Sequence, residues 1–93
     1  MSEADIENQF VDHVKSLGYL ALKLRIDGQN GWPDRTVITD RGVMFFEFKT
    51  PQGRLSAAQG RWMRSLRRLG YKTDTATSLN QAKAALRRFL KGD

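Results

Sequence analysis

The chain has 93 residues, a length that predicts one domain, with 40% hydrophobic residues and a formal net charge of +6. It has no cysteine and one histidine, which excludes disulfides and metal sites built from thiolates or several imidazoles. Any bound metal must be held mainly by carboxylates, which suit hard cations such as Mg²⁺ or Mn²⁺. The sequence shows no signal peptide and no apolar run long enough to cross a membrane, so we expect a globular cytoplasmic protein without a membrane partner.

The two halves of the chain differ in charge. Residues 1–49 hold six Lys or Arg and eight Asp or Glu, a net of −2. Residues 50–93 hold ten Lys or Arg and two Asp or Glu, a net of +8. A basic half indicates a polyanionic partner such as nucleic acid. A solvated surface that only favours solubility explains the same charge, and charge alone leaves both readings open.

The first half of the chain predicts one helix followed by three strands. Apolar residues recur at helical spacing between Ser2 and Gly18, which have the character of a helix start and a helix stop. Short apolar or β-branched runs then predict strands, and Asp40-Arg41-Gly42 is a hairpin signal. The expected strands span residues 19–25, 36–39 and 43–50, with a loop over 27–34.

The second half predicts a helix, a strand and a final helix. Ser56 with Gln59, and Ser78 with Gln81, have the spacing of capping boxes. A strand over 71–77 lies between the two helices, so the full order is α-β-β-β-α-β-α. This order favours a four-stranded mixed sheet flanked by helices. The fourth strand is expected to run parallel to its neighbour, because a helical crossover leads to it.

The third strand carries charges inside its most apolar segment. Alternation predicts two faces, one with Phe45, Glu47 and Lys49 and the other with Met44, Phe46 and Phe48. Both faces carry phenylalanine, so the strand is expected to be central and covered on both sides. Buried charges are normally paired or bound to a metal. Glu47 and Lys49 therefore form either a structural ion pair or part of a functional site.

The register of the hairpin decides whether another carboxylate joins them. A two-residue loop at Arg41-Gly42 would pair Asp40 with Val43, and Asp34 would then face Lys49. Asp34 and Glu47 would be diagonal neighbours on one face, with Cβ atoms about 5–8 Å apart, a separation that suits one shared divalent cation. A bulge at the turn would move Asp34 to the other face.

Two helices each turn one polar side chain toward their apolar face. Glu7 lies within the apolar arc of the first helix and Gln59 within that of the second. Each residue has a simpler explanation, since Glu7 suits the helix dipole, Gln59 completes a cap and Asp34 after Pro33 is a common turn residue. Taken together, acidic ligands, a lysine, an amide and a basic surface are the parts that phosphodiester hydrolysis requires.

The spacing of these residues matches a known nuclease pattern. "WPD" at 32–34 lies thirteen residues before "EFK" at 47–49, as in PD-(D/E)xK nucleases. The stretch "GWPDRTVITDRGVMFFEFKTPQGRLSAAQGRWMRSLRRLGY" at 31–71 closely resembles the VRR-NUC (virus-type replication-repair nuclease) family in its short, stand-alone, phage-like form. The part after "EFK", which includes Gln59, is more specific than the two short motifs.

The resemblance implies a restriction-endonuclease-like αβββαβ core with an extra C-terminal helix, as one domain over residues 1–93. It implies a deoxyribonuclease that depends on Mg²⁺ or Mn²⁺ and needs no small organic cofactor. Lys49 would act on the attacking water and Gln59 would complete the centre. The implied metal ligands are Asp34, Glu47, the backbone carbonyl of Phe48, and Glu7.

The resemblance also implies a homodimer that cuts branched DNA, notably four-way (Holliday) junctions, in a bacterial or phage-infected cell. Trp32 would stack on the DNA, lie in a dimer interface or pack in the core. Two alternatives remain: a nuclease of this fold that cuts flaps, single strands or duplex DNA, and a non-catalytic basic module that binds nucleic acid. The expected DNA contacts are Lys23, Trp32, Arg35, Arg54 and Arg61.

Overall fold

The computed structural model describes residues 1–92, and its elements follow the predicted order. The four strands form one mixed sheet in the order β1-β2-β3-β4, so β3 is internal. The predicted sheet with flanking helices is thus confirmed. The elements are α1 (Glu3–Ser16), β1 (Leu20–Leu22), β2 (Arg35–Thr39), β3 (Gly42–Phe48), α2 (Ala57–Arg68), β4 (Lys72–Ala76) and α3 (Leu79–Leu90).

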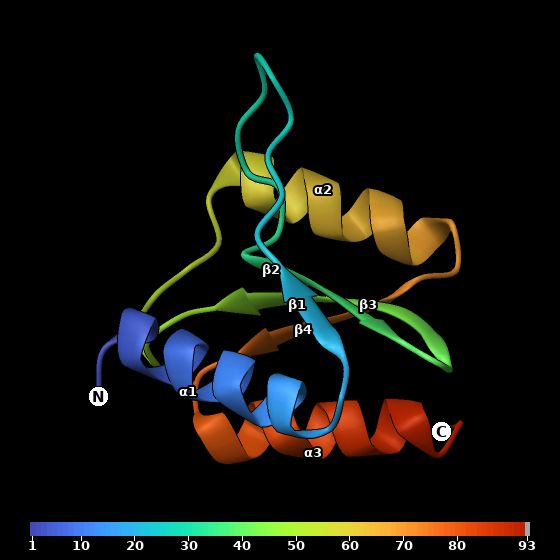
Figure 1. Cartoon of the computed structure of the whole chain (residues 1–93). Coiled ribbons are helices and arrows are strands. Elements are labelled where there is room, and N and C mark those ends of the chain that lie inside the picture. Colours follow the sequence, from blue (N-terminus) through green and yellow to red (C-terminus); the bar gives the residue numbers. More distant parts are fainter. Residues whose placement is uncertain (93) are drawn as a thin grey trace.

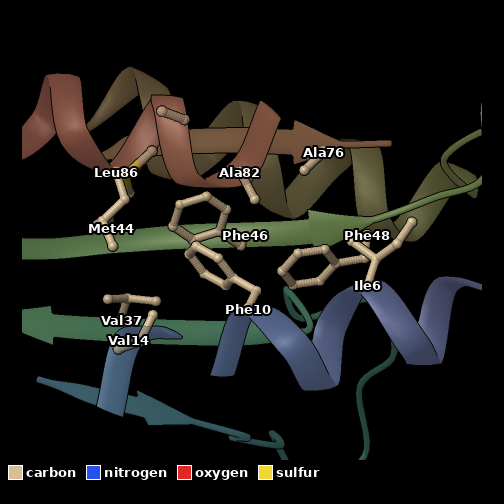
Figure 2. Packing of buried hydrophobic residues seen from close by; sticks show 11 residues of the cluster. Ile6, Phe10, Val14, Val37, Met44, Phe46, Phe48, Ala76, Ala82 and Leu86 are labelled. Carbon is tan, nitrogen blue, oxygen red and sulfur yellow. The ribbon is translucent and has the colours of Figure 1, made fainter. Parts of the chain in front are cut away.

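The helices cover the two faces of the sheet unequally (Figure 1). α1 and α3 lie side by side on one face, and α2 lies on the other. Between the sheet and the α1–α3 layer, Phe10 packs against Phe46 and Phe48, with ring centroids 4.5 and 5.6 Å away (Figure 2). This packing places the even-numbered residues of β3 in the core between the sheet and the α1–α3 layer. Because side chains alternate along a strand, the odd-numbered residues of β3 point toward α2. Within residues 1–92, no helix has the length and apolar character that a membrane crossing requires.

The strand pairings confirm one prediction and correct another. β4 runs parallel to β3, as its helical crossover predicted. β1 is shorter than expected and covers only Leu20–Leu22 of the predicted 19–25 run. The pairing with β2 stops where Leu22 meets Thr36, and residues 23–25 leave the sheet.

The hairpin between β2 and β3 turns one residue earlier than predicted. Thr39 pairs with Gly42, so the two loop residues are Asp40 and Arg41. The hydroxyl of Thr39 accepts a hydrogen bond from the Arg41 amide at 2.9 Å and donates one to the Gly42 carbonyl at 3.0 Å, which closes this tighter turn. The register therefore slides by two residues, which leaves every side chain on its predicted face.

The two predicted capping boxes differ in outcome. The box of Ser56 and Gln59 is complete, with both reciprocal hydrogen bonds at the start of α2. At α3, Ser78 accepts a hydrogen bond from the Gln81 amide, but the Gln81 side chain binds the backbone N–H of Thr77 instead of closing the box. The second prediction was therefore half right, because the glutamine oxygen finds a donor one residue further back.

Candidate active site

Glu47 is a buried carboxylate at the C-terminal end of β3. Its side chain points toward α2, and the residue is only 1% exposed. Ion pairs among residues 1–92 are confined to Glu7, so Glu47 and Lys49 do not form the structural ion pair that the sequence left open. A buried carboxylate without a cationic partner is costly in a domain of this size. Glu47 therefore needs another reason to be there.

Gln59 binds Glu47 from the first turn of α2. The side-chain N–H of Gln59 donates to Oε2 of Glu47 at 3.0 Å, while its Oε1 accepts from the Ser56 amide at 2.8 Å. The backbone N–H of Ser56 can only donate, so it fixes which end of the amide faces the carboxylate. The helix cap and the contact with Glu47, which the sequence offered as alternatives, are made by the same side chain.

Asp34, the residue just before β2, lies beside Glu47. Continued by one residue, the observed register places Asp34 opposite Glu47, where the sequence had predicted Lys49. The carboxylate of Asp34 accepts a hydrogen bond from the Phe48 amide at 2.9 Å, which holds it at the end of β3. The two carboxylates thus lie on one face of the sheet, as predicted, in a more direct pairing.

The pKa of Glu47 is raised by its buried position beside Asp34. Burial raises the pKa of Glu47 to about 8, the negative charge of Asp34 acts in the same direction, and the charge of Lys49 opposes them. The second oxygen of Glu47, Oε1, is buried and has no hydrogen-bond partner among the described residues. An unpartnered carboxylate oxygen beside a second carboxylate suits a divalent cation, which would relieve both the repulsion and the missing contact. The donor set therefore fits Mg²⁺ or Mn²⁺.

Glu7 lies in a different environment from this pair. Its carboxylate is 2.6 Å from Nε of Arg35 and 3.4 Å from Nζ of Lys23. Arg35 pairs with Phe46, so its side chain points to the α1 side of the sheet, and it also donates to the Ala21 carbonyl at 3.2 Å. Within residues 1–92, no three His, Cys, Asp or Glu side chains are grouped closely enough to hold a metal. Glu7 as a metal ligand remains a prediction that this arrangement does not favour.

The residues expected to contact DNA have different surroundings. Lys23 and Arg35 both form ion pairs with Glu7, and the Arg35 side chain is only 16% exposed. Arg54 and Arg61 are exposed and have no ion-pair partner among the described residues. They remain suited to a phosphate backbone, and Arg61 belongs to α2, the helix on the face of the sheet that holds Asp34 and Glu47.

Trp32 packs within the domain. Its ring meets Trp62 and Phe45 edge-on, with centroids 5.1 and 5.5 Å away, and its Nε1 lies 3.4 Å from the hydroxyl of Thr36. Of the three roles that the sequence left open for Trp32, these contacts favour core packing. Trp62 was not among the residues expected at the site, and its indole N–H donates to the Asn30 carbonyl at 2.8 Å. The sequence offered one signal for Trp62: it lies three residues after Gln59, much as Trp32 lies two residues before Asp34.

Comparisons with known proteins identify the family and agree with the fold. The sequence model of the VRR-NUC domain family matches residues 5–80, which include Asp34, Glu47, Lys49 and Gln59. One solved VRR-NUC domain is 24% identical and superposes with a TM-score of 0.84, over 94% of this chain and 97% of that chain. A second, from a VRR-NUC domain protein, is 14% identical, with a TM-score of 0.76 over 98% of this chain and 89% of the other. No curated protein matches the sequence significantly.

Proposed function

Because the chain belongs to the VRR-NUC domain family, which implies a nuclease of the PD-(D/E)xK type, we propose that it is a Mg²⁺- or Mn²⁺-dependent DNA endonuclease. The observation that carries the proposal is the buried, unpartnered oxygen of Glu47 beside Asp34. A structural carboxylate would be expected to have a partner for each buried oxygen. Asp74 also has a buried oxygen without a partner, but the charge that acts on it is that of Arg88 and not that of a second carboxylate. A metal ligand leaves one oxygen free for the cation.

The proposed roles follow from these positions. Asp34, Glu47 and the backbone carbonyl of Phe48 would hold the cation. A bound divalent cation polarises the phosphate and lowers the pKa of a bound water. Gln59 keeps the carboxylate of Glu47 oriented by its hydrogen bond. Lys49 lies near enough to lower the pKa of Glu47 without pairing with it, so its ammonium remains available to orient the attacking water or neutralise developing charge.

For Glu7 we propose a positioning role. Its ion pair with Arg35 anchors the residue that directly follows Asp34 in the chain. Fixing Arg35 on one face of β2 fixes Asp34 on the other, because consecutive strand residues alternate. This role makes Glu7 important for the site without contact with the cation.

A homodimer that acts on branched DNA is part of the proposal. On the α2 face, at the end of the sheet away from Asp34, the register brings Leu20, Ile38 and Val43 into line across three strands. Tyr71 packs on Phe45 and extends this apolar row toward β4. Leu20, Ile38 and Tyr71 are 54%, 36% and 47% exposed. A self-complementary apolar patch is what a two-fold dimer requires, and two copies would supply one site for each of two strands.

Cleavage of a labelled four-way junction, with and without Mg²⁺ or Mn²⁺, tests the proposal. Lys49→Ala should slow cleavage by about two to four orders of magnitude with little loss of binding. A panel of equal-length junctions, flaps, single strands and duplexes identifies the preferred structure. Binding that weakens with salt, without metal-dependent cleavage of any of them, would indicate a nucleic-acid-binding module instead.

The dimer is tested separately by light scattering across a range of protein concentrations. Ile38→Lys places a charge in the apolar row and should shift the protein toward monomer. Leu17→Lys is a matched control, since Leu17 is 44% exposed but lies at the end of α1 on the other side of the sheet. Equal mass distributions for Ile38→Lys and the wild type would exclude this surface as the interface.

A further inference from the structure

The segment that connects β1 to β2 projects from the body of the molecule. Residues 24–31, here called the 24–31 loop, extend past the sheet beside the N-terminal end of α2 (Figure 1). Its charged residues, Arg25 and Asp27, cancel one another, in contrast to the basic second half of the chain. It also exposes an apolar side chain, because Leu24 is 43% exposed. A neutral, partly apolar projection is poorly suited to bind phosphates alone.

The C-terminal end of the loop contacts α2 next to the active site. The carbonyl of Asn30 accepts a hydrogen bond from the Trp62 indole at 2.8 Å. Gly31 lies so close to α2 that a Cβ there would be 2.6 Å from the carbonyl carbon of Ala58 and 2.7 Å from the amide nitrogen of Gln59. Gln59 in turn binds Glu47. The loop is therefore held at a fixed place relative to the carboxylates, as a positioned element must be.

Two hollows border the loop. The first, of about 360 Å³, is lined by residues 24–32 and by Asp34, and we call it the Asp34 hollow. The second, of about 400 Å³, lies between the loop and α2 and is lined by Gln29, Asn30, Ala58, Arg61, Trp62 and Ser65. We call it the Arg61 hollow. Each volume is within the range of small-ligand pockets, and Gln29 and Asn30 line both.

We propose that the 24–31 loop separates the two strands of a DNA branch, so that the strand to be cut enters the Asp34 hollow and its partner enters the Arg61 hollow. This inference rests on the proposed function and adds to it how a branch would be recognised, by a loop that parts the two strands. Each hollow matches part of the chemistry of an unpaired nucleotide. Leu24 and Ile26 offer apolar contact to the face of a base, and Gln29 and Asn30 offer donors and acceptors to its edge.

The energetics favour a branch over continuous duplex. Apolar side chains inserted between base steps unstack them at a cost of about a few kcal/mol per step. At a branch point the strands already part, so less of this cost remains. Arg61 then attracts the displaced strand by charge, and Asp34 receives the other strand where the cation is held. The loop would thus select for branched DNA before any chemical step.

The proposal is tested with a variant of the loop on two junctions, one fully paired and one already open at the branch. Leu24→Ser/Ile26→Ser removes the apolar contacts and retains the backbone contact of Asn30 with Trp62. On a fully paired junction this variant should cleave about tenfold to a hundredfold more slowly than the wild type. On a junction with two mismatched pairs at the branch, the loss of rate should be at least about threefold smaller, because the strands are already apart and only the contacts with the unpaired base are lost. The control, Leu17→Ser, replaces an equally exposed leucine and should match the wild type on both substrates.

Binding is measured independently of cleavage. 2-Aminopurine at the branch point fluoresces more strongly when it leaves the base stack, and Lys49→Ala protein should produce this increase, whereas Leu24→Ser/Ile26→Ser/Lys49→Ala should not. Equal fluorescence with both proteins, or equal loss of rate on paired and mismatched junctions, would overturn the loop's role. If the wild type cleaves none of the DNAs, the proposed function is overturned, and the fluorescence measurement still decides the role of the loop. Circular dichroism confirms that each variant is folded.

Discussion

The side-chain amide of Gln59 joins α2 to the carboxylate of Glu47 in the central strand, at 3.0 Å. The same amide closes the capping box with Ser56. One residue therefore connects the start of a helix to the site, and replacing it should affect both stability and catalysis. The two effects can be separated, because the side chain of Ser56 takes part only in the cap.

Gln59→Ala should lower the cleavage rate by about tenfold to a hundredfold, because Glu47 loses the hydrogen bond that orients it. Ser56→Ala should destabilise the protein by about 1 kcal/mol, because it removes the side-chain acceptor of the cap. It should leave the rate nearly unchanged, because the backbone N–H of Ser56 still orients Gln59. Single-turnover rates and urea unfolding measure the two effects. If Ser56→Ala slows cleavage as strongly as Gln59→Ala, the glutamine acts through the helix cap and not through Glu47.

The raised pKa of Glu47 predicts how the stability of the metal-free protein depends on pH. The folded-state pKa, about 8, lies above the ordinary value of 4.5, so the folded protein binds more protons than the unfolded chain between these values. The contribution of Glu47 to the free energy of unfolding is therefore fully present below about pH 4.5 and is lost as the pH rises through about 8. The loss should amount to a few kcal/mol.

Urea unfolding in EDTA between about pH 5 and about pH 9 measures this decline. Glu47→Gln should remove most of it and make the metal-free protein more stable than the wild type at the alkaline end. Burial also raises the pKa of Asp74, so Asp74→Asn should remove a smaller decline of the same sign. Added Mg²⁺ should stabilise the wild type most at high pH, where Glu47 is ionised, and should not stabilise Glu47→Gln. An unfolding free energy that rises with pH in EDTA would contradict the assignment.

The ion pair of Glu7 and Arg35 predicts a contrast between stability and metal affinity. Both side chains are largely buried, so Glu7→Gln should leave the Arg35 charge poorly compensated and destabilise the protein by about 2 kcal/mol. Its Kd for Mn²⁺ should stay within about threefold of the wild type, whereas Asp34→Asn should raise the Kd by more than about tenfold. Calorimetric titration with Mn²⁺ provides both values. A loss of affinity in Glu7→Gln equal to that in Asp34→Asn would make Glu7 a ligand, as the family resemblance implies.

The sequence predicted the element order and the faces of β3 because periodicity depends only on neighbouring residues. The same alternation placed Asp34 and Glu47 on one face, although the hairpin register was off by two residues. That error arose from the hydroxyl of Thr39, whose hydrogen bonds close the turn early, an interaction that residue types alone do not reveal. The surroundings of Glu7 could not be predicted either, because Arg35 reaches it across 28 positions of sequence. The hollows beside the 24–31 loop depend on how that loop packs against α2, which the pattern "DGQNG" does not specify.

The close approach of Gly31 to α2 predicts a difference between two glycines of the same loop region. Gly31 and Gly28 both have positive φ, +89° and +74°, so alanine at either position costs about 1 kcal/mol in backbone strain. Gly28 has no atoms within 4 Å of an added Cβ, whereas at Gly31 the backbone of Ala58 and Gln59 is in the way. Gly31→Ala should therefore push the loop away from α2, break the hydrogen bond between Trp62 and Asn30, and disturb Gln59.

Thermal unfolding should show a clearly larger loss of stability for Gly31→Ala than for Gly28→Ala, and only Gly31→Ala should reduce cleavage of a paired junction strongly. Tryptophan fluorescence, which reports on Trp32 and Trp62, should change only in Gly31→Ala. Identical behaviour of the two variants in all three measurements would mean that the contact between the loop and α2 does not support the site.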